Sequence, residues 1–108
     1  MTEAALQAQV IELARLCGWR VMHVRRSLGK GQQWTTATSI AGWPDLTLWH
    51  ESRRKLLFIE LKSEIGELSD EQTDVLTSLA RAGQAVQVWR PSDWEHIQAT
   101  LTGAACSA

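Results

Sequence analysis

Three charged side chains, Asp45, Glu60 and Lys62, lie within two apolar segments that the pattern predicts to form a β-hairpin. Residues 42–49 and 56–62 are rich in aromatic and branched aliphatic side chains, and a short polar segment joins them. With the turn in the middle of that polar segment, antiparallel pairing places Asp45 opposite Glu60. Because successive side chains point to opposite faces of a strand, Lys62 emerges on the same face as Glu60. The prediction is that two carboxylates and one ammonium group meet at the open end of the hairpin.

The chemistry of this group depends on whether it is exposed or buried. On an exposed surface, Asp45, Glu60 and Lys62 would form only an ion-pair cluster. The residues between the charges are almost all apolar, however, which predicts a strand that is buried on both faces. Charged groups are seldom buried unless they are paired or bind a metal. Two neighbouring carboxylates repel each other, and Mg²⁺ commonly binds through one or two carboxylates and water. We therefore favour a metal site over an ion-pair cluster.

The same residues belong to a longer pattern. Pro44-Asp45 followed by Glu60-Leu61-Lys62 is the PD-(D/E)xK nuclease signature. Four segments in this order resemble the virus-type replication-repair nuclease domain, called VRR-NUC, and the resemblance extends from about Glu3 to Leu101. The four segments are Gly42-Trp43-Pro44-Asp45-Leu46, Glu60-Leu61-Lys62-Ser63-Glu64, Leu68-Ser69-Asp70-Glu71-Gln72 and Val88-Trp89-Arg90-Pro91.

The resemblance implies a fold, an activity and a set of site residues. The fold is the restriction-endonuclease-like core, an α/β architecture in which helices flank a mixed β-sheet. The activity is hydrolysis of DNA phosphodiester bonds by an endonuclease that uses Mg²⁺ or Mn²⁺. The residues that the resemblance places around one cleft are Glu3, Asp45, Glu60, Lys62 and Gln72.

Each of these residues has a chemical task in this hypothesis. Asp45, Glu60 and the backbone carbonyl of Leu61 bind the metal ion, and Glu3 holds it through water or fills a second metal site. The metal lowers the pKa of the attacking water. Lys62 positions that water or takes part in proton transfer, and it stabilises the negative charge of the transition state. Both one-metal and two-metal arrangements are compatible with the sequence.

Glu3 and Gln72 also have simpler structural interpretations. The spacing of apolar residues predicts a helix over residues 2–17 with Glu3 on its inward face, where a carboxylate also favours the helix N-terminus through the helix dipole. Gln72 completes a capping box with Ser69 at the start of a second helix. Capping alone explains a glutamine here, and the resemblance places the motif glutamine at the same position. One residue can serve both purposes.

Candidate DNA contacts follow the first predicted strand, which covers residues 19–25. They are His23, Arg25, Arg26, Lys30 and Trp34. Basic side chains bind phosphates, and a tryptophan can stack on an unpaired base. The alternatives are a strand histidine with a structural role, solvated arginines and a tryptophan in a dimer interface. Residues 27–41 show no periodicity, so we expect a flexible loop beside the active site.

The rest of the chain completes a single predicted domain over residues 1–108, with its elements in the order αβββαβα. The elements after the hairpin are a helix from Ser69 to Gly83, a strand over residues 84–90, a closing helix over residues 92–101 with a second capping box from Ser92 to Glu95, and a frayed tail over residues 102–108. No internal repeat or linker divides the chain.

Length, charge and cysteine content restrict the broad class. A chain of 108 residues with 44% hydrophobic residues is long enough for one domain with a modest core. The formal net charge of −1 and the pI of about 6.3 neither favour nor exclude nucleic-acid binding. Cys17 and Cys106 lack the spacing of a zinc site or a disulfide framework. The sequence shows no signal segment and no transmembrane run, so we expect a cytoplasmic protein without a membrane partner.

The distribution of basic residues bears on the substrate and on oligomeric state. Arg53, Arg54 and Lys55 lie at the far end of the predicted hairpin, so one chain offers few basic residues beside the cleft. A homodimer would supply two sites and a wider basic surface for DNA. The resemblance implies the same, because short members of the family look like homodimers that act on branched DNA such as Holliday junctions. The alternative is a non-catalytic DNA-binding or assembly module that retains the nuclease fold.

Overall fold

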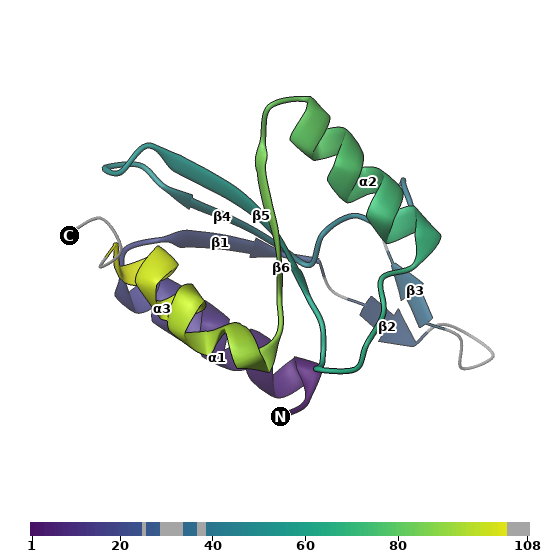
Figure 1. Cartoon of the computed structure of the whole chain (residues 1–108), viewed down its shortest axis with the longest axis horizontal. Helices are drawn as coiled ribbons and strands as arrows, with labels where there is room; N and C mark the ends of the chain where they lie inside the picture. Colours follow the sequence, from purple (N-terminus) through teal and green to yellow (C-terminus); the bar gives the residue numbers. More distant parts are fainter. Residues whose placement is uncertain (25, 29–33, 37–38, 104–108) are drawn as a thin grey trace.

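A four-stranded mixed β-sheet forms the centre of the molecule (Figure 1). The computed structural model describes the backbone of residues 1–24, 26–28, 34–36 and 39–103, and the side chains of residues 1–24 and 39–103. The strands, in spatial order, are β1 (Arg20–His23), β4 (Leu46–His50), β5 (Lys55–Leu61) and β6 (Ala85–Trp89). Neighbouring strands are antiparallel except for β5 and β6, which are parallel. The predicted α/β fold with a mixed sheet is confirmed.

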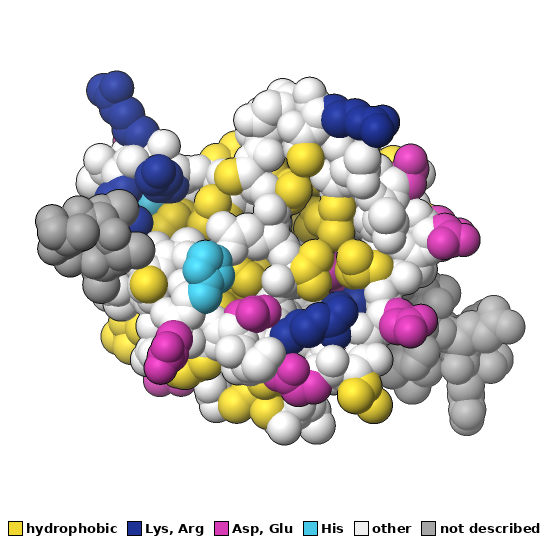
Figure 2. Space-filling view, in the orientation of Figure 1, with side chains coloured by type: hydrophobic (Ala, Val, Ile, Leu, Met, Phe, Trp, Pro, Cys, Tyr) yellow, Lys and Arg dark blue, Asp and Glu magenta, His cyan; other side chains and the backbone are white. Residues whose placement is uncertain are grey.

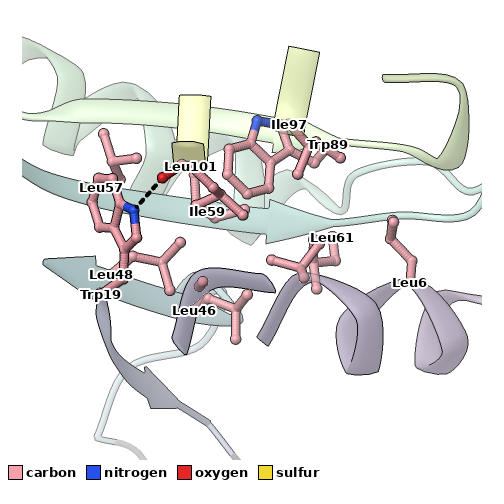
Figure 3. Close-up of a cluster of buried hydrophobic side chains, with 12 residues drawn as sticks. Leu6, Trp19, Leu46, Leu48, Leu57, Ile59, Leu61, Trp89, Ile97 and Leu101 are labelled. Carbon is pink, nitrogen blue, oxygen red and sulfur yellow. Dashed lines mark hydrogen bonds between the residues drawn. The ribbon is translucent and has the colours of Figure 1, made fainter. Parts of the chain in front are cut away.

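Helices cover both faces of this sheet. On one face lie α1 (Glu3–Leu16) and α3 (Trp94–Thr102), which pack with the inward side chains of β4, β5 and β6 to form the main core (Figure 3). On the other face lies α2 (Asp70–Arg81), which contacts the side chain of Glu60 on β5. The buried residues of the main core are Leu6, Val10, Ala14, Trp19, Leu46, Leu48, Leu57, Ile59, Leu61, Trp89, Ile97 and Leu101. The alternation along β5 therefore sends apolar side chains into the main core and Glu60 towards α2.

The β4–β5 hairpin has the register that the sequence predicts. Leu46 pairs with Ile59, and Trp49 pairs with Leu56. Residues 51–54 form the turn, and Arg54 adopts a left-handed conformation there, with φ at 54°. Continuing this register by one residue places Asp45 opposite Glu60.

The first two helices begin as predicted. The hydroxyl of Thr2 accepts a hydrogen bond from the backbone N–H of Ala5 at 3.1 Å, which caps α1. Ser69 and Gln72 form both hydrogen bonds of a capping box at the start of α2. The buried side chains of α1 are Leu6, Val10 and Ala14, which lie at the helical spacing of one face. Both helices therefore keep the positions that their local sequence specifies.

The segment between β1 and β4 contains regular structure that the sequence analysis did not predict. Two three-residue strands, β2 (Arg26–Leu28) and β3 (Trp34–Thr36), pair in an antiparallel ribbon separate from the main sheet. The expectation of a loop over residues 27–41 is therefore wrong for these strands. Three residues are too few to show the alternation of a strand, so the pairing left no periodic signal in the sequence.

The start of the last helix also differs from the prediction. A 3₁₀ turn over Pro91–Asp93 precedes α3, and the side chain of Asp93 accepts a hydrogen bond from the backbone N–H of Arg90 at 2.8 Å. The backbone N–H of Ser92 donates to Glu64 instead of Glu95. The predicted capping box from Ser92 to Glu95 is therefore wrong. Pro91 fits the first position of a helical turn, and this turn delays the α-helix by about two residues.

Hydrogen bonds connect the far end of the hairpin to α3. The guanidinium of Arg53 donates to the carbonyls of Leu101 and Thr100 at 3.1 and 3.2 Å. The indole N–H of Trp19 also donates to Leu101, at 2.8 Å (Figure 3). Arg53 thus has a structural role at the end of α3.

Within the part of the chain that the structure describes, no helix has the length and hydropathy needed to span a membrane.

Candidate active site

Two buried carboxylates meet at the open end of the hairpin. Asp45 directly precedes β4 and is 7% exposed, and Glu60 on β5 is fully buried. The Oδ2 atom of Asp45 accepts a hydrogen bond from the backbone N–H of Leu61 at 2.9 Å. The carbonyl of Asp45 accepts another from the N–H of Val24 at 3.0 Å. The Asp45 backbone and side chain are therefore held by the strands on either side.

Gln72 connects Glu60 to the first turn of α2. Its Nε2 atom donates to Oε1 of Glu60 at 3.2 Å, and its Oε1 atom accepts from the backbone N–H of Ser69 at 2.9 Å. The backbone N–H of Gln72 in turn donates to the Ser69 hydroxyl at 3.1 Å. The glutamine thus caps the helix with its oxygen while its amide group contacts the carboxylate. The predicted cap is confirmed, and a role for Gln72 in the reaction stays a prediction.

Lys62 follows β5 and lies between the sheet and the start of α2. Its backbone N–H donates to the carbonyl of Trp89 at 3.0 Å, which fixes its position beside β6. Its side chain lines a pocket of about 390 Å³ that Gly42, Ser69 and Gln72 also line. Because Gln72 both lines this pocket and binds Glu60, the pocket adjoins the buried carboxylates. The three motif residues Asp45, Glu60 and Lys62 therefore lie around one end of the sheet.

Gly42 brings the segment before Asp45 close to α2. A Cβ atom at this position would lie 2.5 Å from the carbonyl carbon and oxygen of Glu71 and 2.7 Å from the backbone nitrogen of Gln72. The φ angle of Gly42 is +86°, which glycine adopts without strain. The sequence alone assigns this residue no role of its own. Its place two residues before Pro44 in the motif was the signal that could have revealed the close contact.

The donor set of the site is suited to a hard divalent cation. Burying Asp45 and Glu60 next to each other is costly unless a cation or hydrogen bonds compensate their charges. Carboxylate oxygens, together with the Leu61 carbonyl that the sequence hypothesis adds, are ligands that Mg²⁺ and Mn²⁺ prefer. Among the residues that the structure describes, no three His, Cys, Asp or Glu side chains form a metal-binding group. A cation bound by Asp45 and Glu60 would therefore need its remaining ligands from the backbone and water.

Glu3 begins α1 and is half-buried. Leu6, one turn later, lies near Leu61 at the end of β5 (Figure 3), so the start of α1 is at the same end of the sheet as the carboxylates. Glu3 does not join Asp45 and Glu60 in a group of three acidic ligands within the described part of the chain. Its role in holding a metal ion through water or at a second site stays a prediction.

The candidate DNA-binding residues lie on and after β1. His23 is the last residue of β1, pairs with Leu46 and is half-buried. Arg26 and Trp34 begin β2 and β3. Arg25 and Lys30 lie outside the described residues, as do the side chains of Arg26 and Trp34. In the sequence, β2 begins three residues after β1, the strand that precedes the Val24 contact with Asp45.

Comparison with known proteins identifies the family of the chain. The family model of the VRR-NUC domain matches residues 4–93, a span that contains Asp45, Glu60, Lys62 and Gln72 and begins directly after Glu3. No curated protein and no solved structure matches the chain. The matched span covers most of the 108 residues and contains the PD-(D/E)xK signature. The chain therefore belongs to the VRR-NUC domain family, which makes it a nuclease of the PD-(D/E)xK type.

Proposed function

We propose that the protein is a metal-dependent DNA endonuclease with its active site at the open end of the β4–β5 hairpin. The observation that carries the proposal is the pair of buried carboxylates beside Lys62: Asp45, directly before β4, and Glu60 on the adjacent strand β5. Asp45, Glu60 and the Leu61 carbonyl would hold Mg²⁺ or Mn²⁺, with Glu3 as a further ligand through water or at a second ion. When bound, the metal would lower the pKa of the attacking water and add positive charge beside the phosphate.

The protein groups have separate tasks in this reaction. The backbone N–H of Leu61 donates to Oδ2 of Asp45 and so fixes the orientation of that carboxylate beside β5. Gln72 holds Oε1 of Glu60 at 3.2 Å and so fixes the orientation of that carboxylate. Such fixed orientation reduces the reorganisation that the transition state would otherwise require. The hairpin and α2 therefore orient the two acidic side chains from opposite sides.

Lys62 supplies a positive charge beside the two carboxylates. Its side chain lines the pocket beside Gln72, where a DNA phosphate can approach from solvent. An ammonium group there stabilises the negative charge that develops on the phosphate oxygens in the transition state. The same group can hold the attacking water through a hydrogen bond and assist its deprotonation. Loss of Lys62 should therefore affect the chemical step more than the folding of the chain.

The substrate that we propose is branched DNA bound by a homodimer. Basic side chains are scattered across the face of the molecule in Figure 2 and do not gather into one broad patch there. Arg53 binds backbone carbonyls at the far end of the hairpin, so it is not available to the cleft. Strong duplex binding needs many neutralised phosphates. Two copies, each adding His23, Arg25, Arg26, Lys30 and Trp34, would give a wider contact surface for DNA.

The test is cleavage of labelled four-way junction, flap, linear duplex and single-stranded DNA with Mg²⁺ or Mn²⁺. Lys62→Ala is the inactive variant, and Lys55→Ala is its matched control because Lys55 is exposed at the far end of the hairpin. We expect symmetric cuts in the junction that require metal, vanish in Lys62→Ala and persist in Lys55→Ala. Metal-independent binding without cutting of any substrate would instead indicate a non-catalytic DNA-binding module. A monomer at micromolar concentration in solution scattering would contradict the homodimer.

A further inference from the structure

The guanidinium of Arg90 binds the turn that directly follows Lys62. Its Nη1 atom donates to the carbonyls of Ser63 and Gly66 at 2.6 Å each, and it lies 3.4 Å from the carbonyl of Glu64. Arg90 is half-buried and follows β6, so it reaches this turn from the neighbouring strand. We infer that Arg90 is a positioning residue for Lys62, acting through the turn of residues 63–66. This role rests on the proposed function of Lys62.

The turn of residues 63–66 also lies close to the side chain of Lys62. A Cβ atom on Gly66 would lie 3.5 Å from Cδ of Lys62 and 3.0 Å from Oγ of Ser63. Gly66 therefore lies beside the aliphatic part of the lysine. The carbonyl of the same glycine is one of the two that Arg90 holds most closely. Displacement of the turn would leave the side chain of Lys62 less restricted. The position of the ammonium group thus depends on contacts that Arg90 makes.

Arg90 is itself held in place by its surroundings. Its backbone N–H donates to the side chain of Asp93 at 2.8 Å. The residue before it, Trp89, accepts the backbone N–H of Lys62 at 3.0 Å. The side chain of Glu64 accepts a hydrogen bond from the backbone N–H of Ser92, which is a second connection between the turn and the end of β6. The guanidinium therefore joins two segments that two other hydrogen bonds already connect, one on each side of Arg90 in the sequence.

An arginine suits this position for chemical reasons. Its guanidinium is always charged and planar, and the two N–H donors of Nη1 point in fixed directions that match the two carbonyls at 2.6 Å. A lysine ammonium is a compact point charge on a flexible chain, so it does not fix its acceptors in the same defined directions. Replacing Arg90 would leave the carbonyls of the turn to solvent and allow Lys62 to adopt more rotamers. We therefore expect a loss in the rate of the chemical step without a loss of DNA affinity.

The experiment observes Lys62 directly by NMR on the full chain without metal or DNA. The chain has only three lysines, Lys30, Lys55 and Lys62, so their ε-methylene signals can be resolved. The signal that is missing from the spectrum of Lys62→Arg belongs to Lys62. In Arg90→Met, we expect the Lys62 signal to move towards the signal of exposed Lys55. We also expect amide exchange at Gly66, whose N–H donates to Ser63 Oγ at 3.0 Å, to become at least about tenfold faster.

Arg53→Met is the matched control. Arg53 also binds two backbone carbonyls, but at the far end of the hairpin, so its loss should destabilise the fold without moving the Lys62 signal. Arg90→Lys keeps the charge and serves as the second variant if Arg90→Met folds poorly; we expect it to shift the Lys62 signal in the same direction. In cleavage under single-turnover conditions, Arg90→Met should lose about 10- to 100-fold in rate at unchanged DNA affinity.

The possible results separate the two proposals. A Lys62 signal and a Gly66 amide in folded Arg90→Met that match the wild type would overturn the positioning role. An equal shift of the Lys62 signal in Arg53→Met would do the same, because the effect would then be general destabilisation. Wild-type protein that cuts no DNA would refute the nuclease proposal, whereas the NMR comparison would still decide whether Arg90 positions Lys62.

Discussion

The side chain of Asp45 is hydrogen-bonded to the backbone of Leu61, with Oδ2 and N separated by 2.9 Å. Leu61 is the last residue of β5 and stands between Glu60 and Lys62 in the sequence. The carboxylate that precedes β4 is therefore fixed against the centre of the Glu-x-Lys motif by the main chain. This geometry is set by the hairpin register and does not depend on the rotamer of another side chain.

Replacing Asp45 with asparagine should separate the charge of this residue from its structural contact. The amide oxygen in Asp45→Asn can still accept the Leu61 N–H, so we expect the thermal unfolding transition to be retained. Metal-dependent cleavage should fall by at least about 100-fold, because the variant lacks one anionic ligand at the proposed metal site. Asp74→Asn, an exposed position on α2, is the control. Cleavage by Asp45→Asn at the wild-type rate would refute the assignment.

Metal binding should be measurable without DNA. A cation that binds only the folded protein raises the free energy of unfolding, by about 1.4 kcal/mol at a concentration ten times the Kd. We expect Mg²⁺ or Mn²⁺ to raise the melting temperature of the wild type and to leave that of Asp45→Asn unchanged. Isothermal titration calorimetry gives the stoichiometry, which decides between one and two ions. Equal stabilisation of both proteins would place the cation elsewhere on the molecule.

Much of the hairpin and of the helix starts could be predicted because their signals are local. The register of β4 and β5 follows from two apolar segments of similar length around one polar turn, and it brings Asp45 opposite Glu60. The Ser69–Gln72 capping box is likewise a four-residue pattern with a defined geometry. In both cases the residues that interact lie close together in the sequence, so composition and spacing suffice.

The features that escaped prediction depend on contacts between distant segments. Gly42 touches the backbone of α2, and Arg90 binds carbonyls of the turn after Lys62. Backbone carbonyls exist at every residue, so no sequence pattern marks the ones that will accept a guanidinium. The strands β2 and β3 are too short to show a period, and the 3₁₀ turn at Pro91 is set by the Asp93 contact with Arg90.

The two tasks of Gln72 can be separated by comparing two alanine variants. Ser69→Ala removes the hydroxyl half of the capping box and should cost about 1 kcal/mol in the free energy of unfolding. Gln72→Ala removes the other half and also the amide that donates to Glu60 at 3.2 Å. We expect a clear loss of cleavage rate in Gln72→Ala alone, measured at a temperature where both variants are folded. Equal rates in the two variants would mean that Gln72 serves only as a cap.

The close approach of Gly42 to α2 should make this position intolerant of any side chain. In Gly42→Ala the new Cβ would lie 2.5 Å from the carbonyl of Glu71, and the residue would keep a φ of +86°. Strain and overpacking together should lower the free energy of unfolding by about 2–4 kcal/mol in urea denaturation. Gly83→Ala is the matched control, because Gly83 has a similar φ of +90° and nothing within 4 Å of the added Cβ. In Gly83→Ala the free energy of unfolding should fall by only about 1–2 kcal/mol, because the left-handed conformation alone is unfavourable for alanine. If both variants lost the same free energy, the contact with Glu71 would contribute nothing, and the spacing between Asp45 and Gln72 would have to be maintained by other residues.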